Sequence, residues 1–294
     1  MEIILAEVIG FCFGVRRAIE LAEASLRDGR RVNTLGPLVH NPQEIVRLDA
    51  AGIHAVERVE DVHGDTVVIR AHGTRPEVFA ELRRRHLTVV DATCPFVTKS
   101  QRLAREFTRD GLTLVIVGHP DHPEVQGIRG YASHPSYVIS LPEDVATLPA
   151  EIKPGVLAQT TVNEQLFLDV VTALRARFPE ATVRNTVCSA TRERQDAVRQ
   201  LAARVDAVLV IGGRHSSNTN RLTEVCQHVC PKTFLIETAD EIDPRDLLGC
   251  TRVGITAGAS TPAWLIEQVV RRLQAIDAQN GGATPVQEEA PSHG

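Results

Sequence analysis

Short apolar runs alternate with longer amphipathic segments along the chain, and this alternation recurs three times. Each copy begins with a strand-like run that ends at a cysteine, and a helical pattern follows at once. The three junctions read EIILAEVIGFC–FGVRRAIELAEASL, LTVVDATC–PFVTKSQRLAREF and ATVRNTVC–SATRERQDAVRQLAARV. The pattern therefore predicts a threefold internal repeat of roughly ninety residues.

Two further strand-like runs follow in each copy, and each run ends in a small polar turn. The turns after the second run stand 28 residues beyond the cysteine of their repeat and hold His40, His122 and Ser216. The turns after the third run hold His72, Thr160 and Ser260, and loop insertions account for their less even spacing. The polar positions thus repeat along with the apolar ones.

Alternating strands and helices predict an α/β fold, here three similar α/β subdomains with parallel sheets. Ligands of such sheets gather at the carboxyl ends of the strands. If the subdomains pack around a pseudo-threefold axis, the cysteines and polar turns meet in one central cavity. The repeats are predicted to span residues 1–93, 94–187 and 188–276, and residues 277–294 are predicted to form a disordered polar tail.

The composition is that of a globular protein without a nucleic-acid partner. Of 294 residues, 43% are hydrophobic and 23% are charged, and the net charge of −5 leaves no basic footprint. We find no signal peptide and no apolar stretch long enough to cross a membrane, so we expect a cytoplasmic protein without a membrane partner. Thiols stay reduced there, which makes the cysteines candidate ligands or nucleophiles.

The three repeated cysteines, Cys12, Cys94 and Cys188, are the candidate metal ligands. Zinc and iron–sulfur clusters both accept thiolates, but a structural site usually fills all four positions. Three thiolates on a [4Fe–4S] cluster would leave one iron open to a substrate oxygen. Small buried hydrophobes are the alternative interpretation. We predict this packing role for the cysteines outside the repeat, which are Cys226, Cys230 and Cys250.

The polar turns favour a phosphate-bearing ligand. Backbone N–H groups of helix starts and glycine-rich turns, such as Ala257–Ser260 and Gly212–Asn218, suit phosphate, although turn residues also serve simply as helix caps. The candidate histidine donors are His40, His72 and His122. Glu124 lies close behind one of these histidines, and a carboxyl near an anion and a cluster is suited to general-acid catalysis. The alternative for Glu124 is a helix-start carboxylate that interacts with the helix dipole.

Nine motifs together resemble the 4-hydroxy-3-methylbut-2-enyl diphosphate reductase family over about Glu2–Leu273. They are GFCFGVRRAIE, GPLVHNP, RAHGT, DATCPFVTK, HPEVQG, QTT, NTVCSAT, SSNTNRL and TAGASTP. The resemblance implies reductive dehydroxylation of (E)-4-hydroxy-3-methylbut-2-enyl diphosphate to isopentenyl and dimethylallyl diphosphate, the final step of the non-mevalonate route. One departure is visible, because Thr219 stands where some relatives have a serine.

The resemblance also implies a set of site residues. It implies that Cys12, Cys94 and Cys188 hold one [4Fe–4S] cluster, that Glu124 supplies the proton and that Thr161 is a candidate for orienting the hydroxyl. The diphosphate contacts that it implies are His40, His72, His122, Thr160, Ser216, Ser217, Asn218 and Ser260. Electrons would arrive singly from a carrier such as ferredoxin or flavodoxin.

Two other functions fit parts of the pattern. A three-cysteine [4Fe–4S] hydro-lyase, similar in architecture to quinolinate synthase, would consume no reductant. Histidine and hydroxyl turns suit a diphosphate better than a dicarboxylate, which usually attracts arginine. A non-catalytic iron–sulfur sensor is disfavoured by the net charge and by the lack of a DNA-binding motif.

Overall fold

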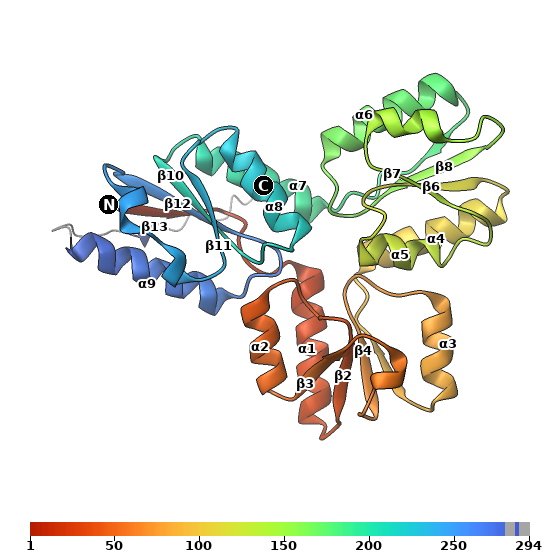
Figure 1. Ribbon diagram of the computed structural model, residues 1–294, viewed down its shortest axis with the longest axis horizontal. Coiled ribbons are helices and arrows are strands. Elements are labelled where there is room, and N and C mark those ends of the chain that lie inside the picture. Colours follow the sequence, from red (N-terminus) through yellow and green to blue (C-terminus); the bar gives the residue numbers. More distant parts are fainter. Residues whose placement is uncertain (280–285, 288–294) are drawn as a thin grey trace. The chain divides into compact units, whose positions relative to one another are not determined.

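The computed structural model describes residues 1–279 and 286–287, and they form three sheets flanked by helices (Figure 1). Sheet A has the order β11-β10-β12-β1-β13, sheet B the order β3-β2-β4-β5, and sheet C the order β7-β6-β8-β9. Every strand pair among the described residues is parallel. The prediction of an α/β fold with three parallel sheets is confirmed.

The strands are short, from two to six residues. Sheet A contains β1 (Glu2–Leu5), β10 (Ala207–Ile211), β11 (Thr233–Ile236), β12 (Arg252–Ala257) and β13 (Val286–Gln287). Sheet B contains β2 (Val32–Leu35), β3 (Ile53–Val56), β4 (Thr66–Ile69) and β5 (Thr88–Asp91). Sheet C contains β6 (Thr113–Val117), β7 (Tyr137–Ile139), β8 (Pro154–Ala158) and β9 (Thr182–Val183).

Helices connect the strands, as parallel pairing requires. The α-helices are α1 (Phe13–Arg27), α2 (Pro42–Ala50), α3 (Pro76–Arg84), α4 (Pro95–Arg109), α5 (Pro123–Arg129), α6 (Glu164–Arg177), α7 (Ser189–Ala202), α8 (Ser217–Gln227) and α9 (Ala263–Gln279). Short 3-10 turns are η1 (Val59–Asp61), η2 (Pro142–Thr147), η3 (Ala239–Glu241) and η4 (Pro244–Leu247). Within the described residues, no helix is long and apolar enough to cross a membrane.

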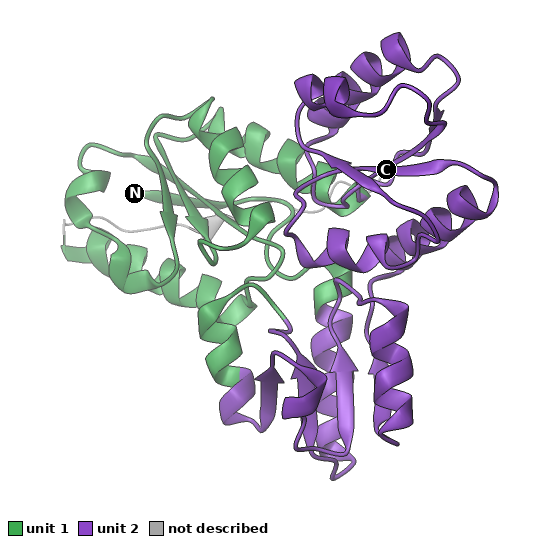
Figure 2. Cartoon of the chain, turned by 45° about the vertical axis from the view of Figure 1, so that its right-hand side comes forward, with its two compact units in different colours: residues 1–15, 39–47, 189–294 green, residues 16–38, 48–188 purple. Residues whose placement is uncertain are grey.

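The chain divides into two compact units (Figure 2). Unit 1 contains sheet A and comprises residues 1–15, 39–47 and the chain from Ser189 onward. Unit 2 contains sheets B and C and comprises residues 16–38 and 48–188. Two of the unit boundaries fall close to repeated cysteines, since Cys12 lies three residues before the end of the first segment of unit 1 and Cys188 ends unit 2.

A strand precedes each repeated cysteine, and the pairing of that strand shows which sheet it belongs to. Strand β5 leads to Cys94 and pairs with β4, and β9 leads toward Cys188 and pairs with β8. Strand β1 leads to Cys12 but pairs with β12, so residues 2–5 join the sheet of the third repeat rather than that of the predicted segment 1–93. Each cysteine thus stands where the chain leaves one sheet.

Successive residues of the central strands pack on opposite faces, because a strand's side chains alternate. In sheet A, Leu209 and Ile211 pack with α9, whereas Val208 and Val210 pack with α8. In sheet C, β6 alternates in the same way between α4 and α6. Burial of these strands on both faces explains why they read as continuous apolar runs.

Helix α9 extends to Gln279, and Asp277 within it is buried. Residues 277–279 are therefore helical, although the disordered tail was predicted to begin at residue 277. Helix α9 therefore continues three residues past the predicted boundary. The other predicted tail residues, 280–285 and 288–294, lie outside the described residues.

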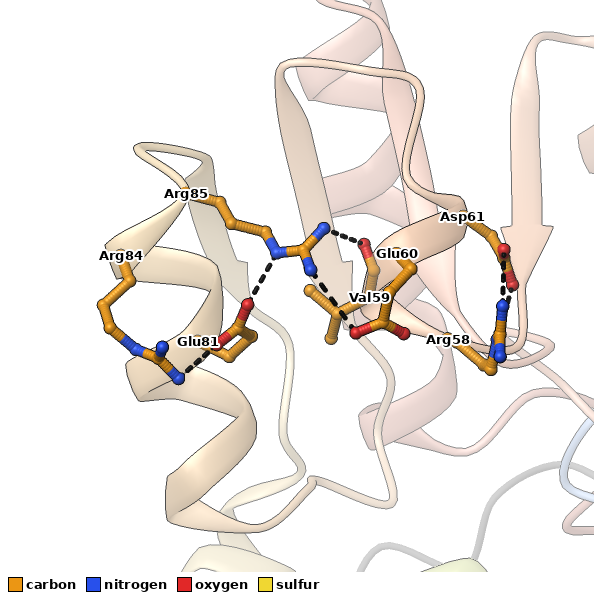
Figure 3. A network of polar contacts seen from close by, with 7 residues as sticks. All are labelled: Arg58, Val59, Glu60, Asp61, Glu81, Arg84 and Arg85. Atoms are coloured by element: carbon orange, nitrogen blue, oxygen red, sulfur yellow. Dashed lines mark hydrogen bonds and ion pairs between the residues drawn. The ribbon is translucent and has the colours of Figure 1, made fainter.

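A network of exposed charges joins η1 to α3 in sheet B's layer (Figure 3). Arg85 donates to Glu81 at 2.6 Å, to the Val59 carbonyl at 3.3 Å and to Glu60 at 3.3 Å. Arg84 also pairs with Glu81. Since these side chains are solvated, the pairs contribute little stability and mainly orient the turn on the helix.

Helix α4 approaches β8 closely at Gly155, which lets us predict a steric effect on stability. A Cβ at Gly155 would lie 2.7 Å from the buried Phe107 ring. Gly155→Ala should therefore lower the free energy of unfolding by about 1–3 kcal/mol, measured by urea denaturation. Gly127→Ala is the matched control, because its Cβ would meet nothing closer than 3.6 Å inside α5. Equal stability of the two variants would contradict this packing.

Candidate functional site

All three repeated cysteines are held by the same kind of backbone hydrogen bond. In each case the cysteine N–H donates to a carbonyl in or next to a predicted third turn. The bonds run from Cys12 to Ala259 at 3.1 Å, from Cys94 to Ala71 at 2.9 Å and from Cys188 to Thr160 at 2.9 Å. These acceptors neighbour or coincide with Ser260, His72 and Thr160, so the fold couples each cysteine to one polar turn.

The three thiols are partly exposed, and each stands directly before a helix. Cys94 is the N-cap of α4, but its side chain makes no capping hydrogen bond. Positive charge at a helix start favours the thiolate form that metals bind. The donor set therefore fits an iron–sulfur cluster. Cys12 lies in unit 1, and Cys94 and Cys188 lie in unit 2.

The cysteines outside the repeat occupy different surroundings. Cys226 and Cys230 are buried in the core beneath α8, and burial raises the pKa of Cys226 to about 12. Burial also raises the pKa of Cys230. Helix α8 ends at Gln227, so Cys226 lies in the helix and Cys230 follows it. Cys250 is partly exposed, 3.9 Å from the Lys232 ammonium.

Unit 1 holds two of the predicted phosphate-binding turns at the carboxyl end of sheet A. Ser216 caps α8 by accepting the Thr219 N–H at 3.3 Å, and Ser217 opens that helix and is exposed. Ser260 follows β12 and is nine-tenths buried. The Nδ2 group of Asn218 is buried and has no hydrogen-bond partner within the described chain. A ligand oxygen would satisfy this donor.

The backbone of His40 lies against the turn that leads to Ser216, at Gly213. A Cβ on Gly213 would lie 2.5 Å from the His40 carbonyl oxygen, so only glycine allows the two turns to approach this closely. His40 directly precedes Asn41, whose Oδ1 accepts the Glu44 N–H at the start of α2. The fold of unit 1 thus brings the predicted His40 and Ser216–Asn218 turns together.

Unit 2 pairs the other two predicted histidines. The rings of His72 and His122 meet edge to face, with centroids 5.5 Å apart and an interplanar angle of 78°. His122 caps α5, because its Nδ1 accepts the Glu124 N–H at 3.2 Å. An accepting Nδ1 places the proton of the neutral ring on Nε2.

Glu124 is a buried site carboxylate whose pKa is shifted by its surroundings. Its side chain is 1% exposed, and both oxygens accept hydrogen bonds from Thr160, one from the backbone N–H and one from the hydroxyl, each at 2.7 Å. Burial raises its pKa to about 7, although the Thr160 bonds pull in the opposite direction. The group can therefore hold a transferable proton near neutral pH. Glu124 stands in the first turn of α5, and Thr160 holds its carboxyl by two hydrogen bonds.

Thr160 is hydrogen-bonded to Glu124, and its chain neighbour Gln159 was not predicted as a site residue. Gln159 is 2% exposed, and its Oε1 accepts the His119 N–H at 3.0 Å. Its Nε2 donates to the Thr161 hydroxyl at 2.7 Å, which leaves that hydroxyl free to donate its own proton. The signal was available in the QTT motif, where a polar amide directly follows the buried strand β8.

Comparison with known proteins gives a consistent result. The family model described as LytB protein matches residues 3–274. A "4-hydroxy-3-methylbut-2-enyl diphosphate reductase" from Geobacter sulfurreducens is 47% identical over 96% of this chain and 100% of its own length. A protein of the same name from Aquifex aeolicus is 45% identical over 94% of this chain and 97% of its own length.

Two solved structures are similar throughout. One is titled as (E)-4-hydroxy-3-methyl-but-2-enyl diphosphate reductase, "the Terminal Enzyme of the Non-Mevalonate Pathway", with a TM-score of 0.72, 45% identity, and coverage of 93% of this chain and 99% of the other. The other is the E-1-hydroxy-2-methyl-but-2-enyl-4-diphosphate reductase from Plasmodium falciparum, with a TM-score of 0.89, 26% identity and coverage of 99% and 92%.

The raised pKa of Glu124 predicts a pH-dependent stability. Its pKa rises from 4.5 to about 7 on folding, so the native state binds the extra proton and loses stability as pH increases through that window. The loss should approach about 3 kcal/mol. Glu124→Gln cannot titrate, so its stability relative to the parent should increase between about pH 5 and about pH 8 in urea unfolding. A difference that stays constant with pH would contradict the burial of an ionisable Glu124.

Proposed function

The chain belongs to the LytB protein family, and we propose that it reductively removes the hydroxyl of (E)-4-hydroxy-3-methylbut-2-enyl diphosphate. The products would be isopentenyl and dimethylallyl diphosphate with water, at the end of the non-mevalonate route. The relatives named for this reaction match this chain over nearly its whole length. The observation that carries the proposal is the buried Glu124, which holds a proton near neutral pH beside Thr160.

The cofactor in this proposal is one [4Fe–4S] cluster held by Cys12, Cys94 and Cys188. The support is chemical, because all three are partly exposed thiols placed before helices by equivalent backbone bonds. When bound, such a cluster would supply single electrons and a Lewis-acidic iron without a protein ligand. Three cysteines at equivalent places leave that fourth position without a thiolate.

The predicted polar turns would bind the diphosphate. The proposed contacts are His40, His72, His122, Thr160, Ser216, Ser217, Asn218 and Ser260. The buried Asn218 amide has a donor to offer, and His122 presents Nε2–H because its Nδ1 caps α5. Neutral donors and histidines can grip a diphosphate by hydrogen bonds while the helix starts add favourable dipoles. This grip would orient the allylic chain.

Protons would reach the substrate through the side chains around Glu124. The reaction consumes two electrons and two protons, and one proton must leave with the hydroxyl as water. Glu124 would donate that proton, and Thr160 would hold its carboxyl in place by two hydrogen bonds. Thr161, whose hydroxyl accepts from Gln159, would direct its own proton toward the substrate oxygen. Exclusion of water around the buried carboxyl keeps it protonated until it acts.

The electron source is a one-electron carrier such as ferredoxin or flavodoxin, and we place the reaction in the cytoplasm. The chemistry supports both parts, because free thiols and a reduced cluster need a reducing compartment. An assay that counts reductant also separates this proposal from a hydro-lyase, which would turn over without consuming electrons.

Removal of the Glu124 proton tests the proposed function. Glu124→Gln should retain the iron and sulfide content and the diphosphate affinity of the parent but lower kcat by about 100-fold or more, because the amide cannot supply a proton. Reductant-coupled turnover of the allylic diphosphate gives kcat. The control is Glu143→Gln, an exposed carboxylate in η2 that should leave kcat unchanged. Near-parental turnover of Glu124→Gln would refute the proton-donor role.

A further inference from the structure

Glu44 is a buried carboxylate in unit 1 without a role in the reaction described above. It stands in the first turn of α2 and is 1% exposed. Arg47 donates to it from Nε at 3.0 Å and from Nη2 at 2.7 Å, and the Trp264 indole N–H donates to Oε2 at 3.1 Å. A charged group this deeply buried is costly unless it is fully paired. The ion pair with Arg47 already balances the charge of Glu44. The additional hydrogen bond from Trp264 therefore needs a separate explanation.

The two ends of that bond lie beside two proposed diphosphate-binding turns. Glu44 follows His40 by four residues, and Trp264 follows Ser260 by four residues. The bond therefore joins α2, which begins after the His40 turn, to α9, which begins after the Ser260 turn. One hydrogen bond between side chains 220 residues apart thus connects the two turns.

Glu44 also holds the His40 turn through its backbone. Its N–H donates to Asn41 Oδ1 at 2.9 Å, and this bond caps α2 directly after His40. Because Oδ1 is needed for the cap, Nδ2 of the fully buried Asn41 must point away from the helix. That Nδ2 has no hydrogen-bond partner within the described residues, which is also true of Asn218 Nδ2. Both turns thus keep an unused buried donor.

The turn that leads to Ser216 is connected to the His40 turn as well. Gly213 packs against the His40 carbonyl so closely that a Cβ there would lie 2.5 Å away, and its own carbonyl accepts the Ser216 N–H at 2.9 Å. A shift of the His40 turn would therefore move the Ser216 turn as well. Glu44 consequently donates its backbone N–H to the Asn41 cap and accepts the Trp264 indole N–H with its side chain, and it thereby couples the His40 turn to α9.

We propose that Glu44 and Trp264 are positioning residues for diphosphate binding: their hydrogen bond holds the His40, Ser216 and Ser260 turns of unit 1 in register. Neither residue contacts the ligand in this proposal. A diphosphate needs several donors at once, so even a small misplacement weakens the grip. The reacting allylic end depends on Glu124 in unit 2, so kcat should be insensitive to the bond. This inference rests on the proposed function.

Two substitutions remove the bond from opposite sides. Trp264→Phe deletes the N–H while keeping an aromatic ring, and Glu44→Ala deletes the acceptor and the Arg47 partner. Glu44→Gln is the conservative rescue variant, because an amide oxygen can still accept from the indole. Ala263→Ser, at an exposed neighbouring position on α9, is the matched control. Trp264 is the sole tryptophan of the chain, so its emission spectrum reports directly on the acceptor.

The measurements are the Kd of inorganic diphosphate by titration calorimetry on the cluster-loaded protein, and KM and kcat for the allylic diphosphate. We expect Trp264→Phe and Glu44→Ala to raise Kd and KM about tenfold or more with kcat within about twofold, and Glu44→Gln to restore most of the affinity. Thermal melting confirms that each variant is folded, and Trp264→Phe serves if Glu44→Ala does not fold.

Three outcomes are distinguishable. A parent protein that fails to bind diphosphate would refute the proposed function itself. A parent that binds, together with folded Trp264→Phe of parental Kd and KM, would overturn the positioning role while leaving the proposed function intact. A loss of kcat with unchanged KM in Trp264→Phe would also overturn it, because the bond would then act on chemistry instead of binding.

Discussion

One backbone hydrogen bond, made three times, organises the candidate site. The N–H of each repeated cysteine donates to a carbonyl at the end of a neighbouring strand, at Ala259, Ala71 and Thr160. The strand that leads to each cysteine pairs in parallel with the strand that ends two residues before the acceptor. The backbone alone therefore holds each repeated cysteine next to a polar turn. The same bond leaves each thiol directly before the next helix.

The burial of Glu124 follows from the same architecture. Its helix α5 follows β6, and Thr160 stands two residues after the end of the adjacent β8, so pairing of these two strands brings the carboxyl onto the threonine. Burial raises the pKa of Glu124 to about 7, while the Thr160 bonds prevent a larger change. In the proposed reaction, a carboxyl in this state combines a fixed orientation with a proton that is present at neutral pH. Gln159 and Thr161 extend the hydrogen-bonded chain from the end of β8.

Much of the fold is predictable because it is local and repeated. The apolar runs, the cysteine at each strand end and the polar turn 28 residues later all follow from periodicity, and so does the parallel pairing. The pairing of β1 with β12 does not follow, because strands some 250 residues apart reveal no partner in their own composition. Cys230 lies beyond α8, because that helix ends at Gln227. Gln159, Glu44 and Trp264 were missed because their importance depends on hydrogen bonds to distant residues.

The central claim is that the three repeated cysteines hold the cluster, and iron analysis tests it most directly. Iron and acid-labile sulfide are counted per chain in the anaerobically purified parent, in the serine variants of Cys12, Cys94 and Cys188, and in Cys250→Ser as a control outside the repeat. The account predicts about four iron and four sulfide in the parent and in Cys250→Ser, and a clear loss of both in each of the three repeat variants. Parental iron content in any of those three variants, or zinc in place of iron in the parent, would contradict it.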